Sequence, residues 1–374
     1  MREPPARLVL LVAFIIFLGL PPLAYLLTAD QSFSETENRY LAQLPAWRPA
    51  RLLDGSLALA LESYLADQFP GRSFWVRVKA AADAGLGKRD VGGAYIGAAG
   101  RLFEKKEPPP PALLRENIAH MAAMAETSGL PCVFLPVYSA AAIYPEYTPP
   151  FAPLLDERRL MRELAAALPP AVAVVDSWKN LTAVRTEDLY FRTDHHWTQT
   201  GAYHAFLALA ARGGWTPEDW QPRDPGAPPF FGALYARAPL PWLDGDKFLL
   251  WEDAALTGVD ISFADTRETA TSPYIYANLK KKDLYTVFLD GNHGETVIRT
   301  QAGSGRRLLM LKDSFAHALT PFLLPYYDEI TMIDLRYYRS PVSALLEKGG
   351  FTEIYFIYNI AWFAEDANFK LVSE

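Results

Sequence analysis

The sequence predicts an α/β protein in which a doubly wound parallel sheet lies between two layers of helices. Short apolar runs alternate with longer segments of helical periodicity, and this alternation is typical of strand–helix–strand units. The apolar runs are too short for helices and are expected to be buried strands. Five strands are predicted in this way: residues 132–135, 171–176, 308–312, 329–334 and 353–358.

The predicted helices lie between these strands. A helix over 112–128 follows a proline-rich break and ends at Gly129, because glycine commonly terminates helices. A helix over 153–168 is stopped by two consecutive prolines. Further helices are predicted at 198–212, 315–325 and 341–348. Strands joined by crossover helices run parallel, so the chain is expected to form one doubly wound sheet.

The N-terminus carries a segment that predicts a membrane helix. Residues 8–27 are apolar without a charge, and about twenty such residues span a hydrocarbon core. Arg2 and Arg7 precede the run, and three acidic residues follow it: Asp30, Glu35 and Glu37. The positive-inside rule then leaves the N-terminus in the cytoplasm and the rest of the chain outside. A cleaved signal peptide is the alternative, but residues 26–29 fit a cleavage site poorly, which favours a retained single-pass anchor.

Three parts are expected along the chain. Residues 1–29 form the cytoplasmic tip and transmembrane anchor, residues 30–50 form a linker, and residues 51–374 form the extracytoplasmic domain. Within that domain, residues 215–306 are rich in proline, glycine and aromatic residues and interrupt the alternation, so we expect a β-rich insertion there. Residues 285–289 and 295–299 flank a glycine-containing segment and predict a hairpin.

Composition limits the possible partners and redox chemistry. Half of the 374 residues are hydrophobic and the net charge is −7. An acidic chain argues against nucleic acid, because neutralising phosphates needs a basic surface. Cys132 is the lone cysteine, so no internal disulfide forms. Its apolar surroundings favour a buried structural thiol over a nucleophile.

Two motifs far apart in the sequence supply the groups for nucleophilic catalysis. The stretch Thr193–Thr198 reads TDHHWT and contains an acid and two candidate bases. Ser314 follows the predicted strand 308–312, at the carboxyl end of the sheet, where ligands of doubly wound folds bind. At a helix N-terminus its own N–H favours negative charge. The alternative is that Ser314 only caps that helix.

A serine hydroxyl needs a base, and His195 and His196 are both offered. A metal site was weighed as another use of these residues, with Asp194 and His204 as further ligands. Adjacent histidines in an extended segment point to opposite faces, and no His-Glu-x-x-His spacing exists. We therefore expect neither a metal nor a cofactor.

In this order along the chain, the motifs resemble the DHHW family, which is related to the SGNH hydrolase superfamily and to alginate O-acetylation proteins of the AlgX and AlgJ type. The segments that carry the resemblance are YFRTDHHWT at 190–198, FGALY at 231–235, YTVFLDGN at 285–292, LKDSF at 311–315 and DLRYY at 334–338. The resemblance covers roughly residues 50–365. It implies an SGNH-like fold in a membrane-anchored, extracytoplasmic protein whose studied relatives acetylate exported polysaccharides, often beside a membrane-bound O-acyltransferase.

The resemblance also implies roles for individual residues. In the acetylating relatives the acid and base are separated by one residue and a tryptophan follows, which corresponds to Asp194, His196 and Trp197. Spacing of i, i+2 in an extended segment puts Asp194 and His196 on one side, so Asp194 fixes the tautomer and leaves a ring nitrogen for Ser314. His195 is expected to point away, behind the base or toward substrate. Trp197 is expected to pack beneath the base or to contact sugar.

Asp313-Ser314 resembles the Gly-Asp-Ser block of the superfamily, with Lys312 in the place of the glycine. The Ser314 N–H is the first expected donor to the oxyanion. The superfamily adds an asparagine side chain and a glycine N–H. Asn359 and Asn292 with its neighbour Gly291 are both candidates at this point. Two further residues, Arg336 and Tyr337, are candidates to line the pocket.

The sequence therefore predicts an extracytoplasmic O-acyltransferase, most simply an O-acetyltransferase, that modifies cell-surface or exported polysaccharide through an acyl-serine. Since acyl-CoA is absent outside the cell, a membrane-bound O-acyltransferase is expected to supply the acyl group. Two alternatives remain open: a carbohydrate acetylesterase with the same triad, and a non-catalytic polysaccharide assembly or binding protein of the cell envelope.

Overall fold

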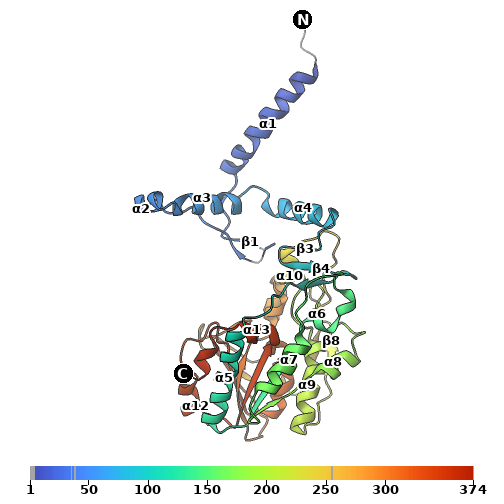
Figure 1. Ribbon diagram of the computed structural model, residues 1–374, viewed down its shortest axis with the longest axis vertical. Helices are drawn as coiled ribbons and strands as arrows, with labels where there is room; N and C mark the ends of the chain where they lie inside the picture. The colour runs from blue at the N-terminus through green and yellow to red at the C-terminus, as the bar shows by residue number, and fades with distance from the viewer. Residues whose placement is uncertain (1–4, 35, 38, 254–255, 374) are drawn as a thin grey trace. The chain divides into compact units, whose positions relative to one another are not determined.

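The computed structural model describes residues 5–34, 36–37, 39–253 and 256–373 (Figure 1). Two of the residues used above to orient the N-terminal segment, Arg2 and Glu35, lie outside this range. The chain divides into two compact units. One comprises Met1–Lys88 with Ala236–Trp242, and the other comprises Arg89–Tyr235 with Leu243–Glu374.

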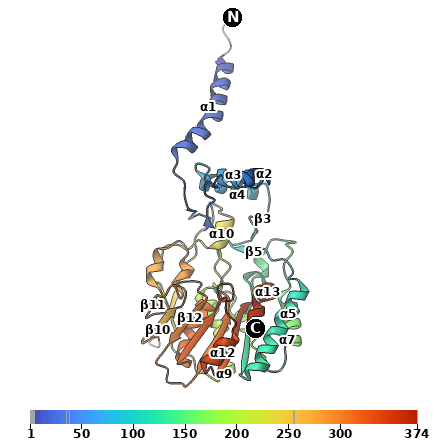
Figure 2. The same ribbon diagram turned by 90° about the vertical axis from the view of Figure 1, so that its left-hand side faces the viewer.

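The second unit is built around an eight-stranded sheet with the strand order β11-β10-β12-β14-β13-β15-β6-β7 (Figure 2). From β14 to β7 all neighbours are parallel. These five strands are β6 (Cys132–Val137), β7 (Val172–Val174), β13 (Arg307–Lys312), β14 (Glu329–Ile333) and β15 (Glu353–Asn359). They are the five strands predicted above, and the α/β fold with a largely parallel, SGNH-like sheet is confirmed.

Helices cover both faces of this sheet. Every residue of β6 and β15 is buried, which requires packing on either side. The crossover from β13 to β14 runs in the opposite direction along the sheet from the crossover between β14 and β15. Right-handed crossovers therefore put the intervening helices on opposite faces. The helices are α5 (Pro111–Ser128), α7 (Glu157–Ala167), α8 (Trp178–Ala183), α9 (Gln199–Gly213), α11 (Ala316–Leu319), α12 (Ser343–Gly349) and α13 (Ile360–Glu365).

The predicted helix after Ser314 is shorter than expected. Only α11 is α-helical, and the chain continues as a 3₁₀-helix, η5 (Thr320–Tyr326). Pro321 and Pro325 lie within that segment, and each lacks the N–H that an α-helix would use. α5, by contrast, ends as predicted, because Gly129 adopts the left-handed conformation with φ 62°.

Residues 215–306 extend the main sheet. β12 (Glu295–Arg299) pairs antiparallel with β14 on one side and with β10 (Asp260–Phe263) on the other, and β11 (Thr269–Ala270) completes the edge. The predicted hairpin over 285–299 is wrong. Leu284–Val287 forms a 3₁₀-helix, η4, rather than a strand. Its apolar side chains are buried, and the Asn278 side chain bonds the Thr286 carbonyl, so tertiary packing overrides the local preference for a hairpin.

The remaining elements of this unit are short. A three-stranded antiparallel sheet contains β3 (Asp90–Val91), β4 (Ala94–Ile96) and β5 (Leu102–Glu104). β8 (Gln221–Arg223) pairs with β9 (Leu250–Glu252). The others are α6 (Ala140–Ile143), η1 (Pro145–Tyr147), η3 (Tyr276–Lys280) and η6 (Phe369–Val372); α10 (Ala233–Arg237) begins in this unit.

The first unit begins with α1 (Pro5–Leu27). Its segment Arg7–Leu27 has a mean hydropathy of 2.5 and none of it is buried, so it is long and apolar enough to cross a membrane. A membrane anchor and a signal sequence share these properties. Two strands and three helices follow: β1 (Phe33–Ser34), β2 (Arg39–Tyr40), α2 (Pro49–Leu53), α3 (Ser56–Asp67) and α4 (Arg72–Gly85).

Candidate active site

Ser314 lies directly beyond β13, which stands between β14 and β15 in the parallel sheet. Asp313 fixes the turn that carries it. The Asp313 side chain accepts the N–H groups of Phe315 (2.9 Å) and Asn359 (2.6 Å), and the Asp313 N–H donates to the Ile357 carbonyl (3.1 Å). In the described part of the chain, the Ser314 N–H donates to no acceptor. That N–H is therefore free to bind a developing oxyanion.

The structure brings Ser314, His196 and Asp194 into one hydrogen-bonded line. Ser314 Oγ lies 2.7 Å from His196 Nε2. His196 Nδ1 lies 2.6 Å from Asp194 Oδ1. Both separations are within hydrogen-bond reach, although 118 residues of sequence separate the serine from the histidine. This is the arrangement that lets an imidazole remove a proton from a serine hydroxyl.

Asp194 is held by a second motif, FGALY. One carboxylate oxygen accepts the His196 backbone N–H (2.9 Å), and the other accepts the Ala233 N–H (2.6 Å). A Cβ at Gly232 would overlap this carboxylate, so the approach of Ala233 requires glycine at position 232. Burial raises the pKa of Asp194, but the neighbouring His195 and His196 and these hydrogen bonds outweigh it and leave the pKa well below its ordinary value.

Asp246 anchors the same segment from the other side. Its carboxylate accepts the backbone N–H groups of Arg192 (2.7 Å) and Thr193 (2.9 Å) and the Thr193 hydroxyl (2.6 Å). Thr193 Oγ1 in turn accepts the Gly232 N–H at 3.2 Å. The loop that precedes Asp194 is thus hydrogen-bonded to the FGALY turn, although neither segment is part of a strand or helix at these contacts.

His196 is buried and uncharged at neutral pH. Burial and the neighbouring His195 lower its pKa to about 4, against the opposing influence of Asp194. A neutral imidazole with Nδ1 bound to Asp194 keeps Nε2 as an acceptor for the serine proton. The His tautomer required of a general base is therefore set by Asp194.

His195 was expected to point away from the base, but in the structure it lies beside it. The centroids of the His195 and His196 rings lie 3.9 Å apart, and His195 Nδ1 is 3.5 Å from Asp194 Oδ1. The reason is that residues 191–196 form a series of bends rather than a strand, so side chains do not alternate. His195 also lines the pocket beside Ser314, which agrees with the substrate-facing alternative.

Tyr285 is a site residue that the sequence analysis quoted only as part of a family motif. Its ring stacks on His196 at 3.8 Å with an interplanar angle of 8°, and its hydroxyl donates to the Ser314 carbonyl at 3.1 Å. Trp197, expected beneath the base, instead donates from Nε1 to the Phe315 carbonyl at 2.9 Å. Trp197 is fully buried, so it supports the serine turn and is not exposed for sugar.

Lys312, which replaces the glycine of the superfamily block, lies in a buried charge network. Its ammonium donates to Asp334 (2.9 Å) and to His317 Nε2 (2.7 Å). Arg336 donates two hydrogen bonds to Asp334, from Nε (2.9 Å) and from Nη2 (2.7 Å). Burial raises the pKa of Asp334, but the two cations outweigh it and hold the pKa at about 2. The network positions the Arg336 guanidinium at the pocket that Ser314 lines.

The structure separates the candidate oxyanion donors. The Asn359 side-chain oxygen, Oδ1, caps α13 by accepting the N–H groups of Ala361 and Trp362. The Asn359 Nδ2 donates to the Val137 carbonyl at 3.1 Å. The Gly291 N–H donates to the Phe288 carbonyl at 3.1 Å. The Gly291 N–H and the Asn359 side-chain oxygen are therefore in use as structural contacts, and one of the two Asn359 Nδ2 protons is bound by Val137.

Asn292 is exposed and accepts from Arg336 Nη2 at 3.1 Å, so it contacts the guanidinium rather than Ser314. Tyr337 is 52% exposed and lies beside the same guanidinium, at 5.6 Å from ring centroid to Cζ. Five residues are candidates here: Asn359, Asn292, Gly291, Arg336 and Tyr337. Among them Arg336 alone lines the pocket with Ser314 in the described structure.

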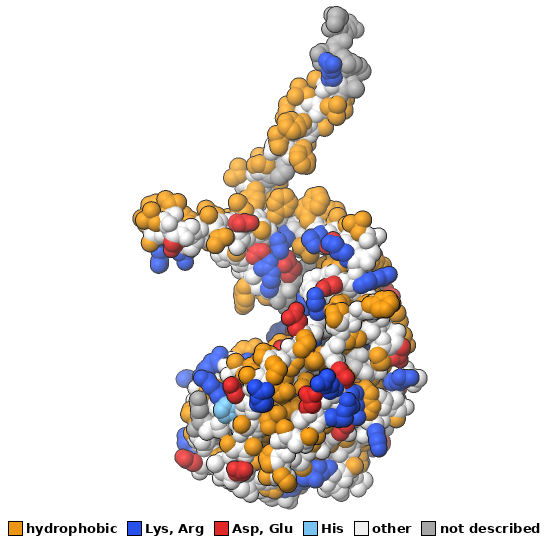
Figure 3. All heavy atoms as spheres, in the orientation of Figure 1, with side chains coloured by type: hydrophobic (Ala, Val, Ile, Leu, Met, Phe, Trp, Pro, Cys, Tyr) orange, Lys and Arg blue, Asp and Glu red, His pale blue; other side chains and the backbone are white. Residues whose placement is uncertain are grey.

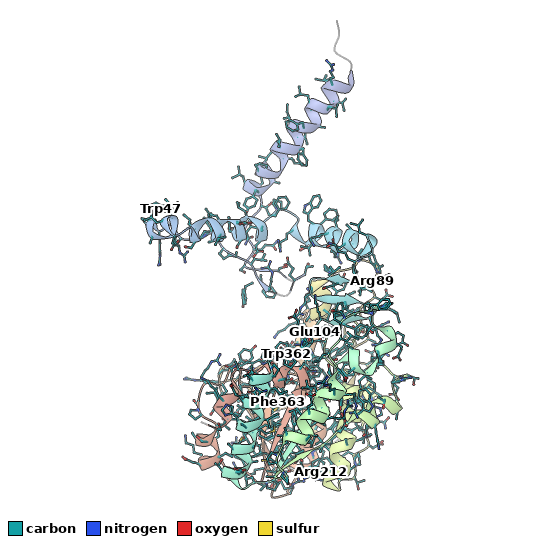
Figure 4. The ribbon with its side chains drawn as sticks, viewed as in Figure 1. Trp47, Arg89, Glu104, Arg212, Trp362 and Phe363 are labelled. Carbon is teal, nitrogen blue, oxygen red and sulfur yellow. The ribbon has the colours of Figure 1, made fainter. Side chains whose placement is uncertain are left out.

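A pocket of about 280 Å³ opens beside the serine. Arg336 and His195 form one part of its lining, and the segment after β15 forms another. Tyr358 is 2% exposed, and its hydroxyl has no hydrogen-bond partner among the described residues. Trp362 is 37% exposed and lies near the strand that carries Glu104 (Figure 4), with Lys106 Nζ 3.5 Å from its ring centroid. An aromatic face and an unpaired hydroxyl suit a polyhydroxylated ligand.

Asp194, His195 and His196 also form the one cluster of three potential metal ligands found in the described ranges, with ligand atoms within 4.8 Å of one another. The Asp194 carboxylate already accepts three N–H groups, and His196 Nε2 faces the serine. Two of the three potential ligands, Asp194 and His196, therefore already have hydrogen-bond partners within the protein. His204, the other ligand considered, lies 3.6 Å from Glu187 instead.

A largely parallel sheet with a serine beyond its central strand defines the SGNH hydrolase-like class. Residues 98–220 match the family model described as "SGNH hydrolase-like domain, acetyltransferase AlgX". Residues 171–333 match the family model described as "DHHW protein". Over these residues the chain is similar to DHHW proteins and to the AlgX-type SGNH hydrolase-like domain, and the resemblance drawn from its motifs is confirmed.

Individual relatives agree with this placement. The probable alginate O-acetylase AlgJ of Pseudomonas putida is 30% identical over 189 residues, which cover 48% of this chain and 46% of the relative. The chain thus matches about half the length of that protein. The solved structure of a DHHW family protein from Eubacterium siraeum has a TM-score of 0.63 at 20% identity, covering 75% of this chain and 95% of that structure. Bacillus cereus PatB1 has a TM-score of 0.62 at 17% identity, covering 73% and 97%. Both likenesses concern the fold.

Proposed function

We propose that this protein is an O-acyltransferase, most simply an O-acetyltransferase, that acts on polysaccharide through an acyl-serine at Ser314. The observation that carries the proposal is the continuous hydrogen-bonded line from Ser314 through His196 to Asp194, at 2.7 and 2.6 Å. The relationship to O-acetyltransferases supports the choice of acyl group. Ser314 is the nucleophile, His196 the general base, and Asp194 the residue that orients and stabilises the imidazole.

The reaction takes two steps. His196 Nε2 removes the Ser314 proton while Oγ attacks the acyl carbon of an activated donor, and the leaving group departs with that proton. The acyl-serine is then attacked by a carbohydrate hydroxyl, whose proton passes to the same Nε2 and back to Oγ as the ester bond breaks. Because His196 is neutral in the resting site, it accepts the proton at the start of both steps.

The oxyanion of each tetrahedral intermediate is assigned to the Ser314 N–H and the Arg336 guanidinium. The Ser314 N–H donates to no acceptor in the described structure, and the Arg336 guanidinium lines the same pocket. Arg336 keeps its charge at any physiological pH: burial lowers its pKa, but the bound Asp334 outweighs this and leaves the pKa above the ordinary arginine value. Removing one such donor typically slows the reaction about 10²–10³-fold.

The location and partners follow from the apolar helix. We infer that α1 is a retained single-pass anchor that holds the second unit outside the cytoplasm, because its apolar length suits a membrane span. Outside the cell acyl-CoA is absent, so a membrane-bound O-acyltransferase would supply the acyl group. The acceptor is a cell-surface or exported polysaccharide, with the partly exposed Trp362 as the residue that receives a sugar ring.

Replacing the nucleophile tests the proposal. With a chromogenic acetyl ester as donor and a panel of neutral and acidic oligosaccharides as acceptors, we expect acetylated sugar from the native chain. Ser314→Ala should lower its formation by roughly 10³–10⁶-fold. The matched control is Ser63→Ala, because Ser63 is exposed and donates only to the Leu59 carbonyl. Unchanged transfer by Ser314→Ala would overturn the proposal. Acetate release without transfer would assign the triad to an acetylesterase.

The pH dependence gives a separate check. Only neutral His196 accepts a proton, so kcat/KM should fall as pH drops through about 4, well below the ordinary histidine value of about 6.5. His195→Asn removes a neighbour that lowers the pKa of His196, so the acid limb should move to higher pH. The measurement is kcat/KM for the chromogenic ester across the acid range, with circular dichroism to confirm folding. An acid limb above about 6.5 in the native chain would contradict the assignment.

A further inference from the structure

Three helices of the first unit leave most of their apolar side chains exposed. Leu57 is the one buried residue of α3 and Ala80 the one buried residue of α4, and α2 has none, within the described structure. Isolated exposed apolar residues are normal, but a contiguous set marks an interaction surface. The exposed members are Leu52 (63%), Leu53 (89%), Leu59 (68%), Leu61 (36%), Leu65 (52%), Phe69 (40%), Phe74 (61%), Trp75 (53%) and Val78 (41%).

Part of this set forms a continuous apolar face. Leu61 and Leu65 are four residues apart on α3, and Phe74 and Val78 are four apart on α4, so each pair projects from one side of its helix. Phe69 lies in the connection between the helices. Trp75 packs edge-on against Phe74 at 5.2 Å between ring centroids. These six residues, Leu61, Leu65, Phe69, Phe74, Trp75 and Val78, are called the apolar face below.

Several charges of the unit form ion pairs with one another. Arg39 binds Asp67 (2.5 Å), and Arg72 binds Glu37 (2.6 Å), which ties β1 and β2 to the helices. In Figure 3 the hydrophobic side chains follow α2, α3 and α4 on the side from which α1 rises, and charged side chains lie beneath them. The unit is therefore polarised, with one apolar side and one ion-paired side.

The apolar face is continuous with the outer end of α1. A recess of about 510 Å³ is lined by Pro22, Tyr25 and Leu26 of α1 together with Leu65 and Phe69. The Tyr25 hydroxyl donates to the Tyr64 carbonyl at 3.3 Å, and the two rings lie edge-on at 6.2 Å. Where α1 leaves the hydrocarbon, Leu65 and Phe69 are therefore its immediate neighbours.

We propose that this apolar face lies in the surface of the lipid bilayer, so that α3 and α4 form an interfacial platform around the exit of α1. Helices with apolar residues on one side and charges on the other bind at the boundary of headgroups and acyl chains. Tryptophan is enriched at that depth, as Trp75 would be. The inference rests on α1 meeting the membrane, as proposed above, and not on the catalytic assignment.

A pair of single-cysteine labels tests the platform in the full-length chain. Val78 belongs to the apolar face, whereas Ser73, also exposed, lines a polar recess with Asp67 and Arg72. Five residues separate them on α4, which turns their side chains about 140° apart. Val78→Cys and Ser73→Cys are labelled with an environment-sensitive fluorophore and reconstituted into phosphatidylcholine vesicles. The unsubstituted chain, whose Cys132 is 1% exposed, is the labelling blank.

We expect the Val78→Cys label to emit at shorter wavelength and to be quenched several-fold more by nitroxide lipids than the Ser73→Cys label. Equal, water-like emission from both labels would overturn the proposal, and it is also the result expected if a protein partner covers the face. A second pair, Leu65→Cys against Ser63→Cys, guards against a local effect of one label. Acetyl transfer is not needed for this readout, so its failure and that of the catalytic proposal are distinguishable.

Discussion

Asp194→Asn is expected to lower acyl transfer by about 10⁴-fold while the protein stays folded. An amide cannot accept the three N–H groups that the carboxylate accepts from His196 and Ala233. The imidazole then favours the tautomer with a proton on Nε2, which donates to Ser314 instead of accepting from it, and loss of the tautomer is the source of the rate penalty. Transfer kinetics with the chromogenic donor measure the effect.

Asp188→Asn is the matched control for that substitution. Asp188 lies in the same segment, its side chain is 72% exposed, and its ion pair is with Arg101 rather than with the site. It should change transfer little. If Asp194→Asn kept transfer within about tenfold of the native rate, another group would have to orient His196, and the triad assignment would fail.

Lys312→Met is expected to destabilise the protein by about 3–5 kcal/mol, which is typical when one partner of a buried ion pair is removed. The side chains of Lys312 and Asp334 are 2% and 1% exposed, so water does not stabilise their charges. The Asp334 carboxylate is instead paired with the two cations Lys312 and Arg336. Removing the ammonium leaves Asp334 with one cation and leaves His317 Nε2 without its donor. Urea unfolding measures the change in free energy.

The loss of stability caused by Lys312→Met depends on pH, because it depends on the ionisation of Asp334. The pKa of Asp334 is lowered to about 2 in the folded protein, so its ion pairs contribute fully above the ordinary aspartate value and are lost as pH falls toward about 2. The difference between the native chain and Lys312→Met should therefore shrink on acidification. Lys88→Met is the control, since that lysine is 57% exposed and should change stability by less than about 1 kcal/mol. Equal losses for the two variants would show that the buried network adds no stability.

The role of Lys312 could not be predicted from the sequence. In the sequence it stands where the related block has glycine, and nothing nearby explains a charged residue at the end of a buried strand. Its partner Asp334 is 22 residues away, directly after the neighbouring strand β14. Parallel pairing of β13 with β14 places the two side chains together, and no local pattern contains that information. The same pairing puts Arg336 at the mouth of the site.

Tyr285 and His195 illustrate the same limit. Residues 285–289 precede a glycine-containing segment and predict a strand, yet burial against the aromatic core and a bond from Asn278 produce a 3₁₀-helix whose tyrosine stacks on the base. His195 was expected on the opposite side from His196 because strands alternate. Asp246 instead holds the residues before it in a bent loop, and both rings face the site.

The sequence by itself determined the five parallel strands, most of the helices, the apolar N-terminal segment and the three residue types now joined at Ser314. These follow from short-range physics: periodicity selects strand or helix, and the carboxyl end of a parallel strand is where a side chain is free to act. Only the tertiary structure decided which neighbours orient that site. Gly232, Tyr285, Lys312 and Asp334 act through contacts between distant segments, and their roles arise only once the sheet and its loops have packed.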